Sequence, residues 1–76
     1  MELYFYEDCE YSQIVLNTIS MLKIKGKIKF KDIRLNPNYS KELVELTGDA
    51  MVPCLVTEDG SMKEAKAIRK YLISRF

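Results

Sequence analysis

The 76 residues are enough for one small domain built around a single hydrophobic core. An apolar fraction of 47% and a charged fraction of 30% are typical of a folded globular protein and argue against disorder. With 12 basic and 11 acidic residues, the net charge of +1 gives no general reason to expect a nucleic-acid or anionic-membrane partner.

The segment types that mark export or membrane insertion are not found in the sequence. No apolar run approaches the roughly 20 residues of a spanning helix, and the first residues do not resemble a signal peptide. Cys9 and Cys54 are too few for a disulfide framework, and without histidine they form no zinc-like ligand set. We therefore expect a cytoplasmic protein in a reducing compartment, without a metal site.

The first predicted element is a strand from Glu2 to Tyr6. Leu3 and Phe5 point to one face of this strand, whereas Tyr4 and Tyr6 point to the other. Because both faces are apolar or aromatic, the pattern indicates a central strand with helices on each side.

A helix is predicted from about Glu10 to Lys25. Its apolar residues recur at helical spacing: Ile14, Val15, Leu16, Ile19, Met21 and Leu22. We expect Asp8 to cap the start of this helix. Lys23 and Lys25 would supply a positive last turn, and Gly26 would end the helix.

From Lys27 to Lys31, lysine alternates with apolar residues, which predicts a strand with one face in water. Lysines on such a strand protect a sheet edge from further pairing. A nucleic-acid contact is the alternative use of these lysines, but no aromatic side chain is interleaved on their face. We interpret the segment as a solvated edge strand.

Asn36-Pro37-Asn38 marks a loop or the entry to a helix. The short helix that follows carries Leu43, Val44 and Leu46, and ends at Gly48.

A strand from Val52 to Thr57 comes next, and a hairpin turn over residues 58–61 follows it, with Gly60 at positive φ. The chain returns antiparallel from Ser61 to Lys63, and a last helix runs from about Glu64 to Arg75. The residues expected to anchor this helix are Ile68, Tyr71, Leu72 and Phe76.

The predicted order is β-α-β-α-β-β-α, with a right-handed parallel βαβ unit first and an antiparallel hairpin last. This is an α/β fold in which three helices flank a four-stranded mixed sheet. Residues 1–76 form one domain in this interpretation.

Cys9 lies where the first strand gives way to the first helix. Unpaired N–H groups and the helix dipole favour a thiolate there, and the thiolate is the reactive form of cysteine. A merely packed cysteine is the alternative, but the neighbours Glu7, Asp8, Glu10 and Ser12 are polar. We interpret Cys9 as a nucleophile.

The acidity of Cys9 is expected to reflect opposing effects. The helix terminus contributes about 0.3–1 kcal/mol, and each nearby carboxylate opposes it by about 1 kcal/mol or less. A hydrogen bond from the Ser12 hydroxyl would recover part of the loss.

Three motifs in this order resemble the glutaredoxin family, in its thioredoxin-like fold. Cys9-Glu10-Tyr11-Ser12 stands where glutaredoxins have Cys-Pro-Tyr-Cys, and Met51-Val52-Pro53 stands where they have Thr-Val-Pro. Residues 59–72 are similar to the end of the glutathione-binding domain of glutathione S-transferases, where a Gly precedes Glu-Ser, Ala-Ile and Tyr-Leu. The chain thus looks like a single-domain glutaredoxin of the transferase-like branch.

The resemblance implies a cis peptide at Val52-Pro53, with the Val52 backbone beside Cys9 and paired with the cysteinyl part of glutathione. It also implies that Glu64 and the backbone N–H of Ala65 hold the γ-glutamyl end. Glutathione would be a co-substrate, with no tightly bound cofactor. The partners implied are glutathione or a glutathionylated protein. Apart from the resemblance, we expect no nucleic-acid or membrane partner, and we expect a monomer.

Four positions depart from the family pattern. Ser12 replaces the second cysteine, so no disulfide can form within the motif. Glu10 replaces proline, Met51 replaces threonine, and Ala65 replaces the serine that would bind the glutathione carboxylate. We expect the Cys9 thiol to be less acidic than in typical glutaredoxins.

The leading hypothesis is a monothiol glutaredoxin-like oxidoreductase that acts through a glutathione mixed disulfide on Cys9. An iron–sulfur cluster shared by two copies is disfavoured, because the Gly-Phe that such relatives carry is missing between Cys9 and Ser12. The alternative from another class is a thioredoxin-fold binding module for a peptide, a protein or a small thiol. A reduced transferase domain is a third hypothesis.

Several residues keep two interpretations. Cys54 fills the core or resolves a Cys9 disulfide, and we favour the core. Tyr11 lines a substrate groove or shields the helix start, and Glu64 holds a ligand amine or supplies helix charge. Lys23, Arg34 and Lys41 meet a ligand carboxylate or are solvated surface, and we favour the surface.

Overall fold

The computed structural model describes residues 1–76. Its elements in chain order are β1 (Glu2–Phe5), α1 (Glu10–Leu22), the 3-10 helix η1 (Lys25–Lys27), β2 (Lys29–Asp32), α2 (Pro37–Thr47), β3 (Cys54–Thr57), β4 (Gly60–Met62) and α3 (Ala65–Arg75). The predicted order of strands and helices is confirmed, with η1 as an additional single turn. The thioredoxin-like α/β fold is therefore the fold of this chain.

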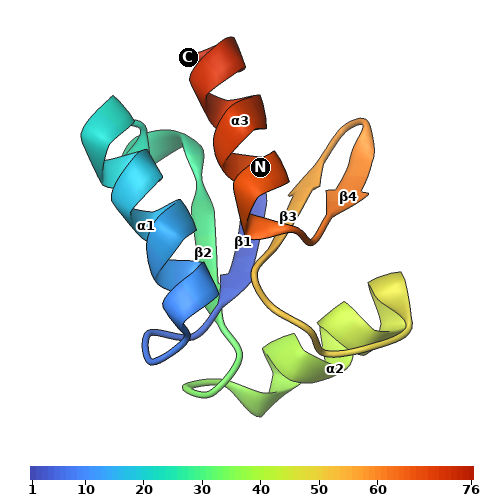
Figure 1. Cartoon of the computed structure of the whole chain (residues 1–76). Coiled ribbons are helices and arrows are strands. Elements are labelled where there is room, and N and C mark those ends of the chain that lie inside the picture. The colour runs from blue at the N-terminus through green and yellow to red at the C-terminus, as the bar shows by residue number, and fades with distance from the viewer.

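The four strands form one mixed sheet in the order β2-β1-β3-β4 (Figure 1). β1 is parallel to β2 and antiparallel to β3, so Leu3 lies between Phe30 and Leu55. The hairpin adds β4 at the other edge. β1 is thus a central strand, as its two apolar faces predict.

Helices cover both faces of the sheet. Figure 1 shows α1 and α3 side by side, with α2 apart from them near the lower end of the sheet. Leu3, Phe5 and Leu55 pack with buried residues of α1 and α3, whereas Tyr4 and Cys54 form a smaller cluster with Leu43 of α2. The alternation of β1 therefore divides the core into two layers.

Helix α1 ends earlier than the sequence predicts. Lys23 takes the left-handed conformation with φ 58°, and the N–H of Ile24 donates to the Ile19 carbonyl at 3.3 Å. Because Ile24 is buried in the main core, the chain leaves the helix before Gly26. Met21, expected on the apolar stripe, is 64% exposed.

Strand β2 is an edge strand, as predicted, but it begins at Lys29 and its lysines are not all solvated. The side chain of Lys31 is only 9% exposed, so the expectation of a solvated lysine face is wrong for this residue. Its ammonium lies 2.6 Å from carboxylate oxygens of both Glu2 and Glu42. Long-range pairing with α2, invisible in the strand pattern, is the physical reason.

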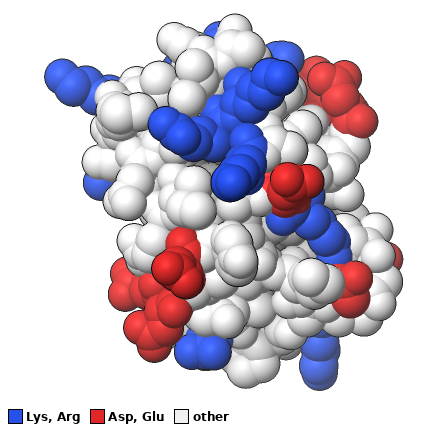
Figure 2. Space-filling view, in the orientation of Figure 1, with Lys and Arg blue, Asp and Glu red and all other residues white.

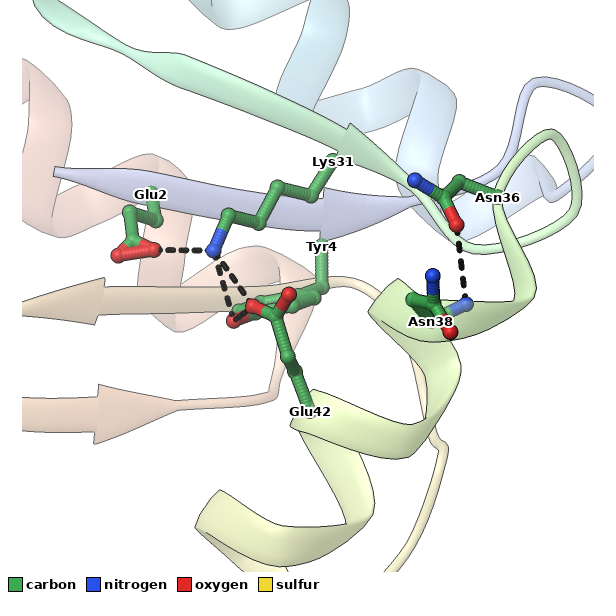
Figure 3. A network of polar contacts seen from close by, with 6 residues as sticks. All are labelled: Glu2, Tyr4, Lys31, Asn36, Asn38 and Glu42. Atoms are coloured by element: carbon green, nitrogen blue, oxygen red, sulfur yellow. Dashed lines mark hydrogen bonds and ion pairs between the residues drawn. The ribbon is translucent and has the colours of Figure 1, made fainter.

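The hydroxyl of Tyr4 completes this network (Figure 3). Tyr4 donates to Glu42 Oε1 at 2.9 Å and accepts from Lys31 Nζ at 3.3 Å. Burial lowers the pKa of Lys31, but hydrogen bonds to Glu2 and Glu42 outweigh it and raise the pKa above its ordinary value. The network therefore joins β1, β2 and α2 through a lysine that stays charged.

Helix α2 begins and ends as its sequence indicates. Asn36 is the N-cap, and its side-chain oxygen accepts a hydrogen bond from the N–H of Asn38 at 3.0 Å. Pro37 occupies the first turn, and Gly48 ends the helix at φ 93°. Of the apolar residues expected to pack here, Leu43 is buried, but Val44 and Leu46 are exposed.

We expect Asn36→Ala to lower the free energy of unfolding by about 1 kcal/mol, because the first turn of α2 loses its capping acceptor. Thermal unfolding followed by circular dichroism would show a melting temperature lower by about 4–8 °C. Asn38→Ala is the matched control, since it keeps the backbone donor of the same bond. Equal melting temperatures for the two variants would contradict this role of Asn36.

The hairpin and the last helix agree closely with their predictions. Gly60 has φ 121°, and α3 follows β4 after two residues. Ile68 and Leu72 are fully buried, and Tyr71 is half-buried. Phe76 is 42% exposed, so its expected burial is wrong: it follows the last helical residue and lies beside the Lys27 ammonium.

None of the helices combines the length and the apolar character that crossing a membrane requires.

Candidate active site

Strand pairing brings the three predicted motifs to one end of the sheet. Cys9 follows the carboxyl end of β1, and the antiparallel pair Tyr4–Cys54 places Val52-Pro53 alongside that same end. The pair Leu55–Met62 brings the end of β4, and hence the start of α3, to this end as well. Segments separated by more than 40 positions in the sequence therefore lie at the same end of the sheet.

Cys9 is the N-cap residue of α1. Its backbone is extended, at φ −85° and ψ 118°, and its carbonyl accepts from the N–H of Gln13 at 3.0 Å. The side chain is half-buried and makes no capping hydrogen bond. The predicted helix start is confirmed, but the expected capping by Asp8 is wrong, because the chain enters the helix one residue later and Asp8 faces solvent.

The surroundings of Cys9 favour its thiolate. Burial raises the pKa of Cys9, but nearby donors that stabilise a thiolate outweigh it and lower the pKa below its ordinary value: the Ser12 hydroxyl, the N–H groups of Ser12 and Tyr11, and the Tyr6 hydroxyl. Hydrogen bonding, rather than repulsion by the flanking carboxylates, sets this direction.

Ser12 is suited to a thiolate rather than to a thiol. Its hydroxyl is fully buried and has no well-formed hydrogen bond to any group in the chain. A buried hydroxyl without a partner is costly, and a sulfur anion next to it supplies the missing acceptor. That Ser12 donates to the sulfur stays a prediction.

We expect Ser12→Ala to raise the pKa of Cys9, because the donor that most favours the thiolate is lost. The pH dependence of iodoacetamide alkylation, followed at Cys9 by mass spectrometry, would move to higher pH. Ser20→Ala, an exposed position on the same helix, is the control and should leave the profile unchanged. An unchanged profile for Ser12→Ala would contradict the role of its hydroxyl.

The second motif contains the cis peptide that the resemblance implies, at Val52-Pro53. Pro53 is fully buried, and Val52 packs half-buried against the cluster of Tyr4, Leu43 and Cys54. Cys54 has no exposed surface, and burial raises the pKa of its thiol. The interpretation of Cys54 as a core residue is therefore confirmed.

An ion pair connects the loop before the cis peptide to the segment before α3. Lys63, just before α3, pairs with the carboxylate of Asp49, which also accepts a hydrogen bond from Met51 N at 3.1 Å. The hydrogen bond from Lys63 lowers the pKa of Asp49 below its ordinary value. The pair ties the approach to Val52-Pro53 to the segment that leads into α3.

The third motif supplies the start of α3. Glu64 is the N-cap residue, and its exposed side chain makes neither a capping hydrogen bond nor an ion pair. Ala65 is buried against the main core and has no hydroxyl to offer a ligand. An anionic group could therefore be bound here by the unpaired backbone N–H groups in the first turn of α3.

Tyr11 is 64% exposed in the first turn of α1, so it does not shield the interior. Lys23 caps the opposite end of that helix, and Lys41 is exposed on α2. The structure thus leaves Tyr11 beside Cys9 but places Lys23 away from it.

Sequence reasoning missed a contact between Tyr6 and Arg34. The Arg34 guanidinium lies 3.7 Å from the centre of the Tyr6 ring and 3.7 Å from the Asp8 carboxylate. Arg34 is mostly exposed, as expected, but it lies beside Tyr6, whose hydroxyl is among the donors that lower the pKa of Cys9. The parallel pairing of β1 with β2 brings Tyr6 and Arg34 together, and no local sequence pattern indicates this contact.

No group of three or more histidine, cysteine, aspartate or glutamate side chains is arranged to hold a metal ion.

The solved structures that are similar to this chain include the following two. A glutathione S-transferase domain-containing protein from Marinobacter aquaeolei VT8 matches with a TM-score of 0.78 and 23% identity, over 100% of this chain and 38% of that one. Gtt2 from Saccharomyces cerevisiae matches with a TM-score of 0.73 and 24% identity, over 95% and 36%. At these identities the likeness shows the fold, and this chain spans little more than a third of either protein.

None of the curated proteins matches the chain significantly. The family model of the glutathione S-transferase N-terminal domain matches residues 3–76, which is nearly the whole chain. The chain therefore belongs to the family of glutathione S-transferase N-terminal domains.

Proposed function

We propose that this protein is a monothiol, glutaredoxin-like thiol–disulfide oxidoreductase that carries glutathione on Cys9. The observation that carries the proposal is the half-buried Cys9 thiol at the start of α1, with hydrogen-bond donors that favour its thiolate. Membership of a family named for glutathione S-transferases supports a glutathione-related function.

The proposed reaction has two exchange steps. The Cys9 thiolate attacks the glutathione sulfur of a glutathionylated substrate, a Cys9–glutathione disulfide forms, and the substrate leaves as a thiolate that takes up a proton. The thiolate of a second glutathione then attacks the glutathione sulfur of that mixed disulfide. Oxidised glutathione leaves, and the Cys9 thiolate is regenerated.

The second step requires an external thiol. Ser12 has no sulfur with which to displace glutathione, and Cys54 is fully buried with a raised pKa, so neither suits the resolving role. We therefore assign resolution to a second glutathione. No tightly bound cofactor is needed in this scheme.

Glutathione would lie across the shared end of the sheet. Its cysteinyl backbone would pair with Val52 next to the cis Pro53, and its γ-glutamyl carboxylate would meet the first N–H groups of α3 near Ala65. Glu64, whose carboxylate is free, would hold the γ-glutamyl amine. Tyr11 would cover the bound peptide from the exposed side of α1.

A turnover assay tests the proposal. With a glutathionylated peptide, reduced glutathione, glutathione reductase and NADPH, the protein should accelerate the exchange at least about tenfold over the uncatalysed reaction. Double-reciprocal plots at several peptide concentrations should be parallel, since a covalent intermediate gives ping-pong kinetics. Binding of glutathione without any acceleration would contradict the enzyme and favour the binding-module hypothesis.

We also propose that the single domain acts as a monomer in a reducing cytoplasm, where glutathione keeps the resolving thiol supplied.

A further inference from the structure

The exposed side of α3 carries an unusual concentration of positive charge. Of the 12 lysine and arginine residues of the chain, four lie within Ala65–Arg75, which contains none of the 11 aspartates and glutamates. The rest of the chain, with eight basic residues against eleven acidic ones, is net negative. Figure 2 shows several blue side chains gathered over α3, with one red group next to them and further blue and red groups elsewhere on the same view.

No cation of α3 lies within ion-pair distance of a carboxylate of the chain. The four ion pairs of the structure involve Lys31, Arg34 and Lys63, and none involves a cation of α3. Lys66 and Lys70, four residues apart, repel each other by a few tenths of a kcal/mol. Lys66 also lies in the first turn of α3, where the helix dipole disfavours a cation.

These cations share one side of the helix with an apolar residue and border a surface hollow. Lys66, Arg69, Lys70, Ile73 and Ser74, which we call the α3 basic face, line a groove of about 500 Å³. Arg69 also borders a second hollow, which continues over α1 beside Ile14, Asn17, Thr18 and Met21. Met21 is 64% exposed and Ile73 is 46% exposed, so apolar surface flanks the positive charge.

We propose that the α3 basic face and the adjoining surface of α1 bind an acidic amphipathic helix of a partner protein. Carboxylates one turn apart on such a helix would pair with Lys66, Arg69 and Lys70. Its apolar stripe would pack on Met21 and Ile73. Mixed cationic and apolar surface along a groove is the complement of an acidic amphipathic helix.

Two other polyanions fit the surface less well. A membrane would require an exposed apolar face on α3, but Ala65, Ile68 and Leu72 are buried in the core of the domain. Single-stranded nucleic acid would require aromatic side chains among the cations, and the α3 basic face has none. The proposal does not depend on the chemistry of Cys9.

A designed peptide of about 18 residues, long enough to be helical in water, is the probe. It carries glutamate on one face and leucine on the other, and a control peptide has every glutamate replaced by glutamine. Fluorescence anisotropy should show weak binding of the acidic peptide, with Kd about 10 μM, and weaker binding at high salt. Amide shifts in NMR spectra should map to α1 and α3.

Charge-neutralised variants locate the site. Arg69→Gln combined with Lys70→Gln should weaken binding about tenfold, since two ion pairs to the partner are lost. Lys29→Gln combined with Lys41→Gln removes the same charge from exposed positions on β2 and α2 and should leave Kd unchanged. Met21→Ser should weaken binding while leaving its salt dependence intact.

Three results would overturn the proposal. The first is equal affinity for the acidic and the glutamine peptide, and the second is equal loss in the two double variants. The third is tighter binding of an oligonucleotide, or of vesicles with anionic lipid, than of the peptide, with the same dependence on Arg69 and Lys70.

Discussion

Cys9→Ser should reduce the turnover of a glutathionylated peptide to the uncatalysed rate, a loss of at least about tenfold, because the thiolate that attacks the disulfide is removed. A serine hydroxyl stays protonated near neutral pH. The donors that favour a thiolate at this position therefore cannot turn the hydroxyl into an anionic nucleophile. The fold should be unaffected, because the Cys9 side chain is half-buried and makes no capping bond.

Cys54→Ala is the matched control for this experiment, because it removes the other thiol of the chain. Cys54 is buried with Tyr4 and Leu43, so the variant should lose some stability but keep its turnover number at temperatures where it is folded. Full activity in Cys9→Ser, or loss of activity in a folded Cys54→Ala variant, would contradict the assignment of the nucleophile.

The largest effect on stability is expected for Lys31→Glu. The ammonium of Lys31 is buried between the carboxylates of Glu2 and Glu42, and it also donates to Tyr4. A carboxylate there would place three acidic groups together and leave the Tyr4 hydroxyl without its cation. We expect the free energy of unfolding to fall by about 3 kcal/mol, measured by urea denaturation at neutral pH.

Lys29→Glu makes the same charge change two residues away on the same face of β2, at an exposed position, and should cost less than about 1 kcal/mol. Lys31→Met should stay within about 1 kcal/mol of wild type, because an apolar side chain of similar length needs no partner. Equal losses in Lys31→Glu and Lys29→Glu would contradict the structural role of the network.

The same network predicts how stability depends on pH. The hydrogen bond from Lys31 lowers the pKa of Glu42 in the folded state below its ordinary value of 4.5. A lowered folded pKa contributes stability that is present above that ordinary value and is lost as pH falls through the folded value. Urea denaturation of wild type should therefore show a loss below about pH 4.5 that is smaller in Lys31→Met.

Local chemistry explains why much of the fold was predictable. Asn36-Pro37 begins a helix because an Asx oxygen and a fixed φ suit its first turn, and Gly60 takes the positive φ that the hairpin requires. Alternation in β1 separates Leu3 from Tyr4, and the two helix layers follow from it. These features depend on residues close in sequence.

The wrong predictions involve tertiary contacts. Lys31 follows the pattern of a solvated edge, but Glu42, eleven residues later, reaches back to it from α2. Gly26 is the expected helix stop, but burial of Ile24 ends α1 at Lys23 instead. In both cases a distant partner or the core overrides a local preference.

The candidate site divides in the same way. Cys9 and Val52-Pro53 are recognisable in the sequence because a cysteine at a helix start and a proline before a strand are local motifs. The stacking of Arg34 on Tyr6 depends on the pairing of β1 with β2, and no motif marks it. The free Ser12 hydroxyl likewise becomes informative only when its burial is known.

The most direct test of the central claim is the intact mass of the protein after incubation with oxidised glutathione near neutral pH. We predict one added glutathione, present in Cys54→Ala and missing in Cys9→Ser. A loss of two hydrogens that either variant abolishes would instead reveal a Cys9–Cys54 disulfide, and it would contradict both the monothiol mechanism and the core role of Cys54. An unmodified wild-type protein would contradict Cys9 as the carrier of glutathione.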